Sequence, residues 1–143
     1  MVDEEIFVDK LQYINQYTDD LRQMRGQSRD QYLTDMIRQR AVERTLMNLI
    51  QACIDLAQHI RATEDLAESE TAKQEIQALG EAGVITSETQ VKMEEAVGFR
   101  NILAHRYGDV DQEVVFDVLQ DDLQWFERFQ QELAQWFQQQ HST

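Results

Sequence analysis

The chain has 143 residues but contains no proline and only five glycines. These two residue types interrupt helices most strongly, because proline lacks a backbone N–H and glycine is unusually flexible. Apolar residues recur every three or four positions over long stretches, which is the period of one helix face. The sequence therefore predicts an all-α fold, an up-and-down helical bundle with four main helices and one short helix.

The first two main helices are expected in the N-terminal half of the chain. The first runs from about residue 3 to residue 24 and ends before Gly26. The second begins at Ser28, because Ser28 and Gln31 have the spacing of a capping box. Its apolar series passes through Ile37 and Ala41 and continues to about residue 60, which makes this helix long enough to be the spine of the bundle.

The other helices are expected after residue 62. Residues 62–86 are less regular, and we expect one short helix there that ends between residues 80 and 83. The third main helix opens at Ser87, with Gln90 at capping-box distance, and ends near residues 105–108. The fourth starts around Asp111, a good N-cap residue, and continues to the C-terminal region.

Length and composition predict one soluble domain over residues 1–143. No window approaches the 18 apolar residues of a membrane span, and the first residues do not resemble a signal peptide. Cys53 is the only cysteine, so no intrachain disulfide is possible, and the sequence indicates a reducing, cytoplasmic location. The single cysteine and three scattered histidines match no standard zinc spacing, so we expect no metal and no cofactor.

Charge is distributed unevenly along the chain. The formal net charge is −14, which argues against a general nucleic-acid coat protein. Six arginines nevertheless lie within residues 22–44, and residues 97–106 contain Arg100 and Arg106 without any acid. Positive charge is therefore concentrated in two segments, whereas the acidic remainder is also what a merely soluble surface would carry.

Residues 100–107 combine side chains that suit RNA cleavage. A histidine such as His105, with an ordinary pKa near ~6.5, can accept or donate a proton close to neutral pH. A guanidinium such as that of Arg100 can hold phosphate oxygens and oppose the charge that builds in the transition state. Asn101 lies four residues before His105 and can orient it by a hydrogen bond. By residue type alone, however, a histidine at a helix end is more often a cap or a surface residue.

The spacing of Arg100 and His105 leaves their geometry open. At ~100° per residue, their side chains would lie about 140° apart on an ideal helix. One solution is a helix that ends or distorts near Ala104, so that both side chains converge within one subunit. The other is a homodimer that brings two copies of the motif into one cleft.

With Arg100, Asn101, His105 and Tyr107 at these positions, the chain resembles the HEPN superfamily, and within it the HepT-like toxins encoded beside an MntA-type nucleotidyltransferase antitoxin. The resemblance extends to residues 83–85 before the motif and to residues 110–111 after it. It also includes residues 40–44 and 52–57 in the second helix. It is specific over roughly residues 40–60 and 80–116, and only general in the terminal helices.

This resemblance implies a metal-independent RNase toxin that acts as a homodimer with Arg100, Asn101 and His105 as catalytic residues. It also implies neutralisation by an MntA-like nucleotidyltransferase antitoxin, which adds AMP to the tyrosine at position 107. We further expect the two arginine-rich segments to be neighbours that line the RNA cleft. Three RNA-binding residues are then expected: Arg40, Arg44 and Arg106.

Three alternatives remain open from the sequence. The chain could be a non-catalytic HEPN binding module that supports a nucleotidyltransferase partner. It could also be a helical dimer with an unrelated scaffold role. Finally, Arg40 and Arg44 could pair with acids on adjacent helices, a common arrangement in acidic bundles, and then have no role in RNA binding.

Overall fold

The computed structural model describes residues 1–105 and 109–141. All the regular elements within these two ranges are α-helices, which confirms the predicted all-α fold. In chain order they are α1 (Glu4–Met24), α2 (Arg29–Leu33), α3 (Met36–Thr63), α4 (Ala72–Glu81), α5 (Ser87–His105), α6 (Gln112–Asp121) and α7 (Leu123–His141).

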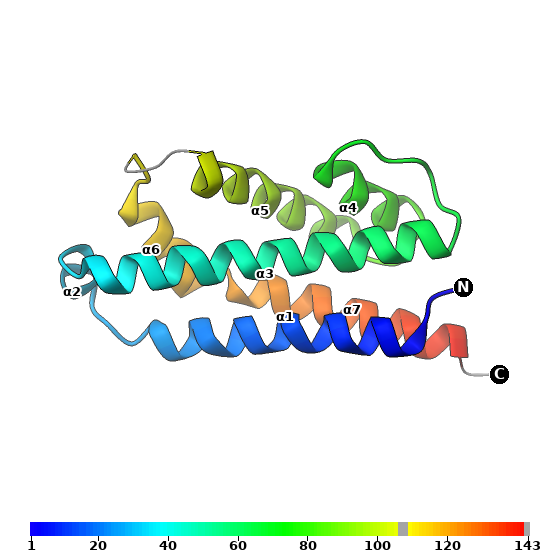
Figure 1. The fold of residues 1–143 in the computed structure, drawn as a ribbon, viewed down its shortest axis with the longest axis horizontal. Helices are drawn as coiled ribbons and strands as arrows, with labels where there is room; N and C mark the ends of the chain where they lie inside the picture. The colour runs from blue at the N-terminus through cyan, green and yellow to red at the C-terminus, as the bar shows by residue number, and fades with distance from the viewer. Residues whose placement is uncertain (106–108, 142–143) are drawn as a thin grey trace.

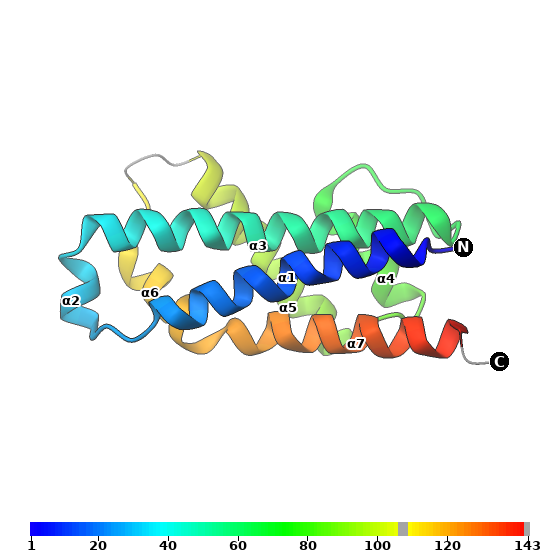
Figure 2. The ribbon, with the colours of Figure 1, turned by 60° about the horizontal axis from the view of Figure 1, so that its bottom comes forward.

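Four long helices form an up-and-down bundle. Helices α1, α3, α5 and α7 alternate in direction, so that α7 ends at the end of the bundle where α1 begins (Figure 1). Each long helix packs against the next, and α1 also packs against α7, so the ring of four helices is closed. Figure 2 shows α1 between α3 and α7. None of the described helices has the length and apolar character that a membrane span requires.

Helix α3 supplies the centre of the core, with nine buried residues from Val42 to Ile60. Their spacing of three and four positions follows the helical period, so they face the other three long helices together. Across the bundle, the rings of Phe7 and Phe137 stack with their centroids 4.3 Å apart, which joins α1 to α7. This burial of apolar surface is the main force that holds the long helices together.

The predicted second helix is in fact two helices, α2 and α3. The Ser28–Gln31 capping box is present, but it starts only the five-residue α2. The hydroxyl of Thr34 donates to the carbonyls of Asp30 and Gln31, and the Asp35 carboxylate caps α3 by accepting from the N–H of Arg38. Local side-chain bonds of this kind compete with helix continuation.

The predicted core face of the N-terminal part of α3 is also wrong. Ile37 and Ala41 are exposed, Ile37 to 84%, although the apolar series had placed both inside the bundle. The buried series begins at Val42 and continues through Leu46 and Leu49. The N-terminal half of α3 therefore presents apolar surface to solvent in this single chain.

Two further boundaries differ from the prediction. The expected fourth helix is divided into α6 and α7 at Asp122, which ends α6 with its N–H bonded to the carbonyl of Val118. Helix α5 begins at Ser87 as expected, but its cap is Thr86, whose hydroxyl accepts from the N–H of Thr89. The predicted Ser87–Gln90 capping box is therefore wrong by one residue.

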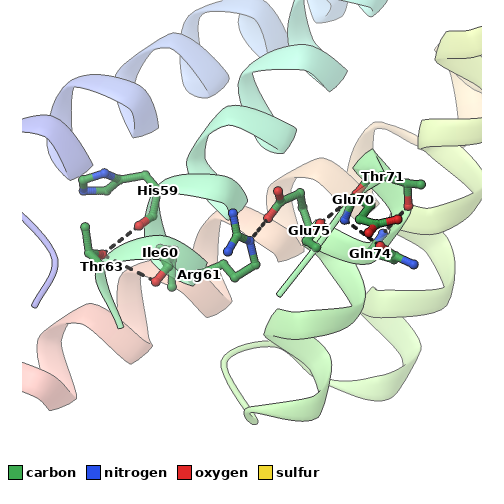
Figure 3. Close-up of polar contacts among 9 residues, drawn as sticks. His59, Ile60, Arg61, Thr63, Glu70, Thr71, Gln74 and Glu75 are labelled. Carbon is green, nitrogen blue, oxygen red and sulfur yellow. Dashed lines mark hydrogen bonds and ion pairs between the residues drawn. The ribbon is translucent and has the colours of Figure 1, made fainter. Parts of the chain in front are cut away.

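The short helix α4 is fixed to α3 by an ion pair. The guanidinium of Arg61 on α3 reaches across to the carboxylate of Glu75 on α4, as Figure 3 shows. The two side chains are only 17% and 9% exposed. Because α4 also packs along α5, this pair supports the helix that carries Arg100 and His105.

Candidate functional site

Helix α5 stays helical through His105, so it does not end before the last residue of the predicted motif pair. The side chains of Arg100 and His105 therefore leave the helix about 140° apart. Arg100 lies on the half-buried side, whereas Asn101 and His105 are exposed one turn apart. Helix α5 thus ends within one residue of Ala104, but it keeps Arg100 and His105 on one helix, where their side chains diverge.

Arg100 has an unusual environment for an arginine. It is half-buried, its Nε atom is inaccessible to solvent, and that atom has no hydrogen-bond partner. Among the residues that the structure describes, Arg100 also forms no ion pair. A half-buried guanidinium without a counter-charge costs free energy. Its remaining donors are available to an anion that is not part of this chain.

The two arginine-rich segments lie at the same end of the bundle. Helix α3 begins, and helix α5 ends, beside α2 and α6 in Figure 1, and α3 packs against α5. Arg40 and Arg44 are both exposed on α3. Helical periodicity places the two side chains on one face of that helix. The chain therefore gathers its positive charge at the end of the bundle where α5 ends.

Several of these arginines pair with acids, which is the arrangement that the last of the three alternatives from the sequence described. Arg22 contacts Glu127 at 2.5 Å, and Arg29 contacts Asp117 at 2.7 Å. Arg40 is paired at 2.9 Å, but its partner Glu43 is on the same helix rather than on an adjacent one. Arg44 has no ion pair with any described residue.

Tyr32 is a residue near this end that the sequence did not single out. It is fully buried, and its hydroxyl donates to Oε1 of Gln112, the first residue of α6, at 2.8 Å. Burial raises its pKa well above the ordinary value, the nearby Glu43 carboxylate adds to the increase, and Arg40 opposes it. The ring also packs against Phe116 of α6. Tyr32 thus anchors the helix that follows the motif.

Two of the predicted site residues, Arg106 and Tyr107, lie outside the described residues. Asp111 is described, and its carboxylate caps α6 by accepting from the N–H of Glu113. Over the described part of the chain, no group of three His, Cys, Asp or Glu side chains is close enough to hold a metal ion.

Comparison with known proteins gives consistent matches. A family model, Ribonuclease HepT-like, matches residues 14–133. The mRNA nuclease HepT of Shewanella oneidensis is 28% identical over 125 residues, which are 87% of this chain and 93% of that protein. The tRNA nuclease HepT of Aphanizomenon flos-aquae is 32% identical over 117 residues, which are 82% of this chain and 80% of that protein.

A solved structure has the same fold. It is that of a tri-AMPylated HEPN toxin of Shewanella oneidensis in complex with its MNT antitoxin. The toxin superposes on this chain with a TM-score of 0.86 at 26% identity, over 93% of this chain and 99% of the other. The likeness therefore extends over nearly the whole of both chains.

Proposed function

This chain belongs to the family of HepT-like ribonucleases, and on that basis we propose that it is an RNase toxin that cuts RNA with Arg100 and His105. In this proposal a partner nucleotidyltransferase antitoxin neutralises the toxin by adding AMP. The observation that carries the assignment is Arg100, a half-buried guanidinium with no ion-pair partner among the described residues, on the same helix end as the exposed His105.

The chemistry requires one proton acceptor, one proton donor and a phosphate clamp. A histidine removes the proton of the RNA 2′-OH, whose oxygen attacks the adjacent phosphorus. The new 2′-O–P bond forms as the P–O5′ bond breaks, and the leaving O5′ takes up a proton from a water molecule. The products are a 2′,3′-cyclic phosphate and a 5′-hydroxyl end. Arg100 holds the non-bridging phosphate oxygens, and Asn101 orients His105.

A second copy of the chain completes this site. Arg100 and His105 diverge on one α5 helix, so a two-fold axis near the end of α5 is the way to bring them together. Exposed apolar side chains near this end offer a surface for that contact: Met36, Ile37, Ile102 and Val114. In such a dimer each Arg100 acts together with the His105 of the other copy.

Mixing two inactive variants tests this shared site. Arg100→Ala and His105→Ala proteins should each be inactive alone, but together they should regain about a quarter of the wild-type rate. Random pairing makes about half of the dimers mixed, and each mixed dimer holds one complete Arg–His pair out of two. The measurement is the cleavage rate of a labelled RNA after the subunits have exchanged. A mixture as inactive as its components would show that the two groups act within one subunit.

The position of Tyr107, two residues after His105, supports regulation by AMP addition. A transferred AMP would bring bulk and negative charge next to the proposed proton-transfer group and would repel RNA phosphate. The tri-AMPylated state of the Shewanella oneidensis toxin is consistent with such a modification.

Tyr107→Phe should therefore separate cleavage from neutralisation. The variant should still cut RNA and arrest growth, but the partner nucleotidyltransferase with ATP should add no AMP to it. Intact-mass spectrometry and a growth assay report both effects, with the wild-type chain as control. Modification of the phenylalanine variant would assign the AMP to another residue.

RNA binding is proposed for Arg40, Arg44 and Arg106. Arg44→Gln should weaken RNA binding and flatten the plot of log affinity against log salt by roughly 0.7 to 0.9 for each phosphate that the variant no longer neutralises. Arg40→Gln should change the slope less, because Glu43 already neutralises Arg40. Turnover of bound RNA should remain nearly unchanged in both variants. An unchanged salt slope together with earlier melting would make these arginines structural.

A further inference from the structure

A polar groove runs between α1 and α3 next to the exposed Arg44. Its cavity volume is about 300 Å³. Tyr13 and Tyr17 line it from α1, and Asn48, Gln51 and Asp55 line it from α3. The dimensions suit one or two planar ring systems rather than a large ligand.

The two tyrosines offer a stacking surface at this groove. Their ring centroids are 6.3 Å apart with an interplanar angle of 24°, and Tyr13 is 49% exposed. Neither hydroxyl forms a hydrogen bond with a residue that the structure describes. Unpaired nucleobases stack on aromatic side chains of this kind, and the stacking tolerates any base because each has a π face.

The α3 side of the groove is rich in hydrogen-bond acceptors. Gln51 Nε2 donates to Oδ1 of Asp55 at 2.9 Å, which leaves the amide oxygen of Gln51 and the second carboxylate oxygen of Asp55 for a ligand. The side chain of Asn48 forms no hydrogen bond with the residues that the structure describes, and it supplies one further acceptor and a donor. Carboxylates in the groove repel phosphate, but they accept hydrogen bonds well from the donors on the edge of a base.

Arg44 provides the phosphate contact that the groove itself lacks. It lies four residues before Asn48, so the two side chains share one face of α3 about 6 Å apart along the helix. A single nucleotide is long enough to place its base beside Asn48 and its phosphate at Arg44. Lys10 on α1 also lines the groove, where it partly offsets Asp9 and Asp55.

We propose that this groove is a base-binding subsite for single-stranded RNA, in which an unpaired base stacks on Tyr13 and Tyr17 while its phosphate contacts Arg44. Guanine fits best, because its Watson–Crick edge presents two adjacent donors, N1–H and N2–H, to the acceptors of Asp55 and Gln51. The subsite rests on the proposed RNase function and adds to it a preference for guanine in the RNA that is bound.

Binding to cleavage-deficient protein tests the stacking. In a His105→Ala background, fluorescence anisotropy should follow a labelled oligouridine that carries one central guanosine. Replacing both tyrosines with leucine should weaken binding by roughly 5- to 150-fold for each stacked base that is removed, whereas Tyr13→Phe with Tyr17→Phe should keep most of the affinity. Asn15→Leu, on an exposed part of α1 outside the groove, is the matched control. Circular dichroism should report equal helicity in all variants.

The hydrogen bonds to guanine are tested by exchanging the guanosine for inosine, which lacks the N2 amino group. The wild-type groove should prefer guanosine by roughly tenfold, and Asp55→Asn should remove that preference. Equal binding of the leucine and phenylalanine variants, or equal affinity for the two bases, would overturn the subsite. The subsite would also be overturned if the leucine variant lost binding of the antitoxin while its RNA binding stayed unchanged. If no RNA binds and the wild-type protein does not cleave, the proposed function itself fails.

Discussion

Replacing His105 with alanine should slow RNA cleavage by roughly 10²–10⁴-fold, the usual contribution of a positioned proton-transfer group. The melting temperature should stay the same, because the side chain is exposed and forms no hydrogen bond or ion pair with the described residues. The control is His141→Ala, which removes another exposed histidine at the far end of α7. If the His105 variant cleaves at a rate close to that of wild type, another residue moves the proton.

The same assay separates Arg100 from its neighbours. Arg100→Ala should lose roughly 10²–10³-fold in rate, as expected for a group that stabilises transition-state charge. Its stability should be equal to or higher than that of wild type, because a half-buried charge without a partner is removed. Arg100→Lys should not restore the rate, since an ammonium lacks the fork that holds two phosphate oxygens. Asn101→Ala should have the smallest effect.

The largest effect on stability is expected at the ion pair between α3 and α4. Arg61→Met should lower the free energy of unfolding by about 3 kcal/mol, because Glu75 is left with a nearly buried charge and no partner. Adding Glu75→Gln to this variant should restore part of the loss. Chemical denaturation measures both changes.

The matched control is the same substitution at a more exposed pair. Arg29 and Asp117 are 45% and 55% exposed where they are paired, so Arg29→Met should cost at most about 1 kcal/mol. Equal losses at the two positions would show that burial does not set the strength of the Arg61–Glu75 pair.

Helix type and order could be predicted from the sequence because long apolar periods were not interrupted by proline. The breaks at residues 34–35 and at Asp122 could not, since they depend on short-range competition by polar side chains. At Thr34 and Asp35 the side chains take over backbone partners that a continuous helix would have used. The sequence signal was a threonine–aspartate pair within an apolar series, which a count of apolar positions alone passes over.

The exposure of Ile37 has a different cause. At ~100° per residue, Ile37 lies about 140° from Val42 and about 180° from Leu46 on α3, so it faces away from the buried side of that helix. The sequence also could not show which arginines would lack a partner. Arg29 pairs with Asp117 because α2 packs against α6, whereas Arg44 forms no ion pair with a residue that the structure describes.

The sequence predicted which residue types form the candidate site, but it did not predict how their side chains are arranged. The motif spacing was compatible with two arrangements, and the proposal of a shared site rests on the helical geometry of α5 up to His105, its last residue. The half-buried state of Arg100 likewise depends on tertiary packing. Tyr32 was missed because a tyrosine on a five-residue helix has no periodic pattern that would mark it as buried.

The most direct measurement of the proposed activity is cleavage of a defined RNA by the purified chain in a buffer that contains a metal chelator. We expect the wild-type protein to cleave and to leave 2′,3′-cyclic phosphate ends, whereas the Arg100→Ala/His105→Ala double variant, purified in the same way, should not cleave. Cleavage at an equal rate by the double variant, or no cleavage by the wild-type protein until a metal ion is supplied, would contradict the proposal.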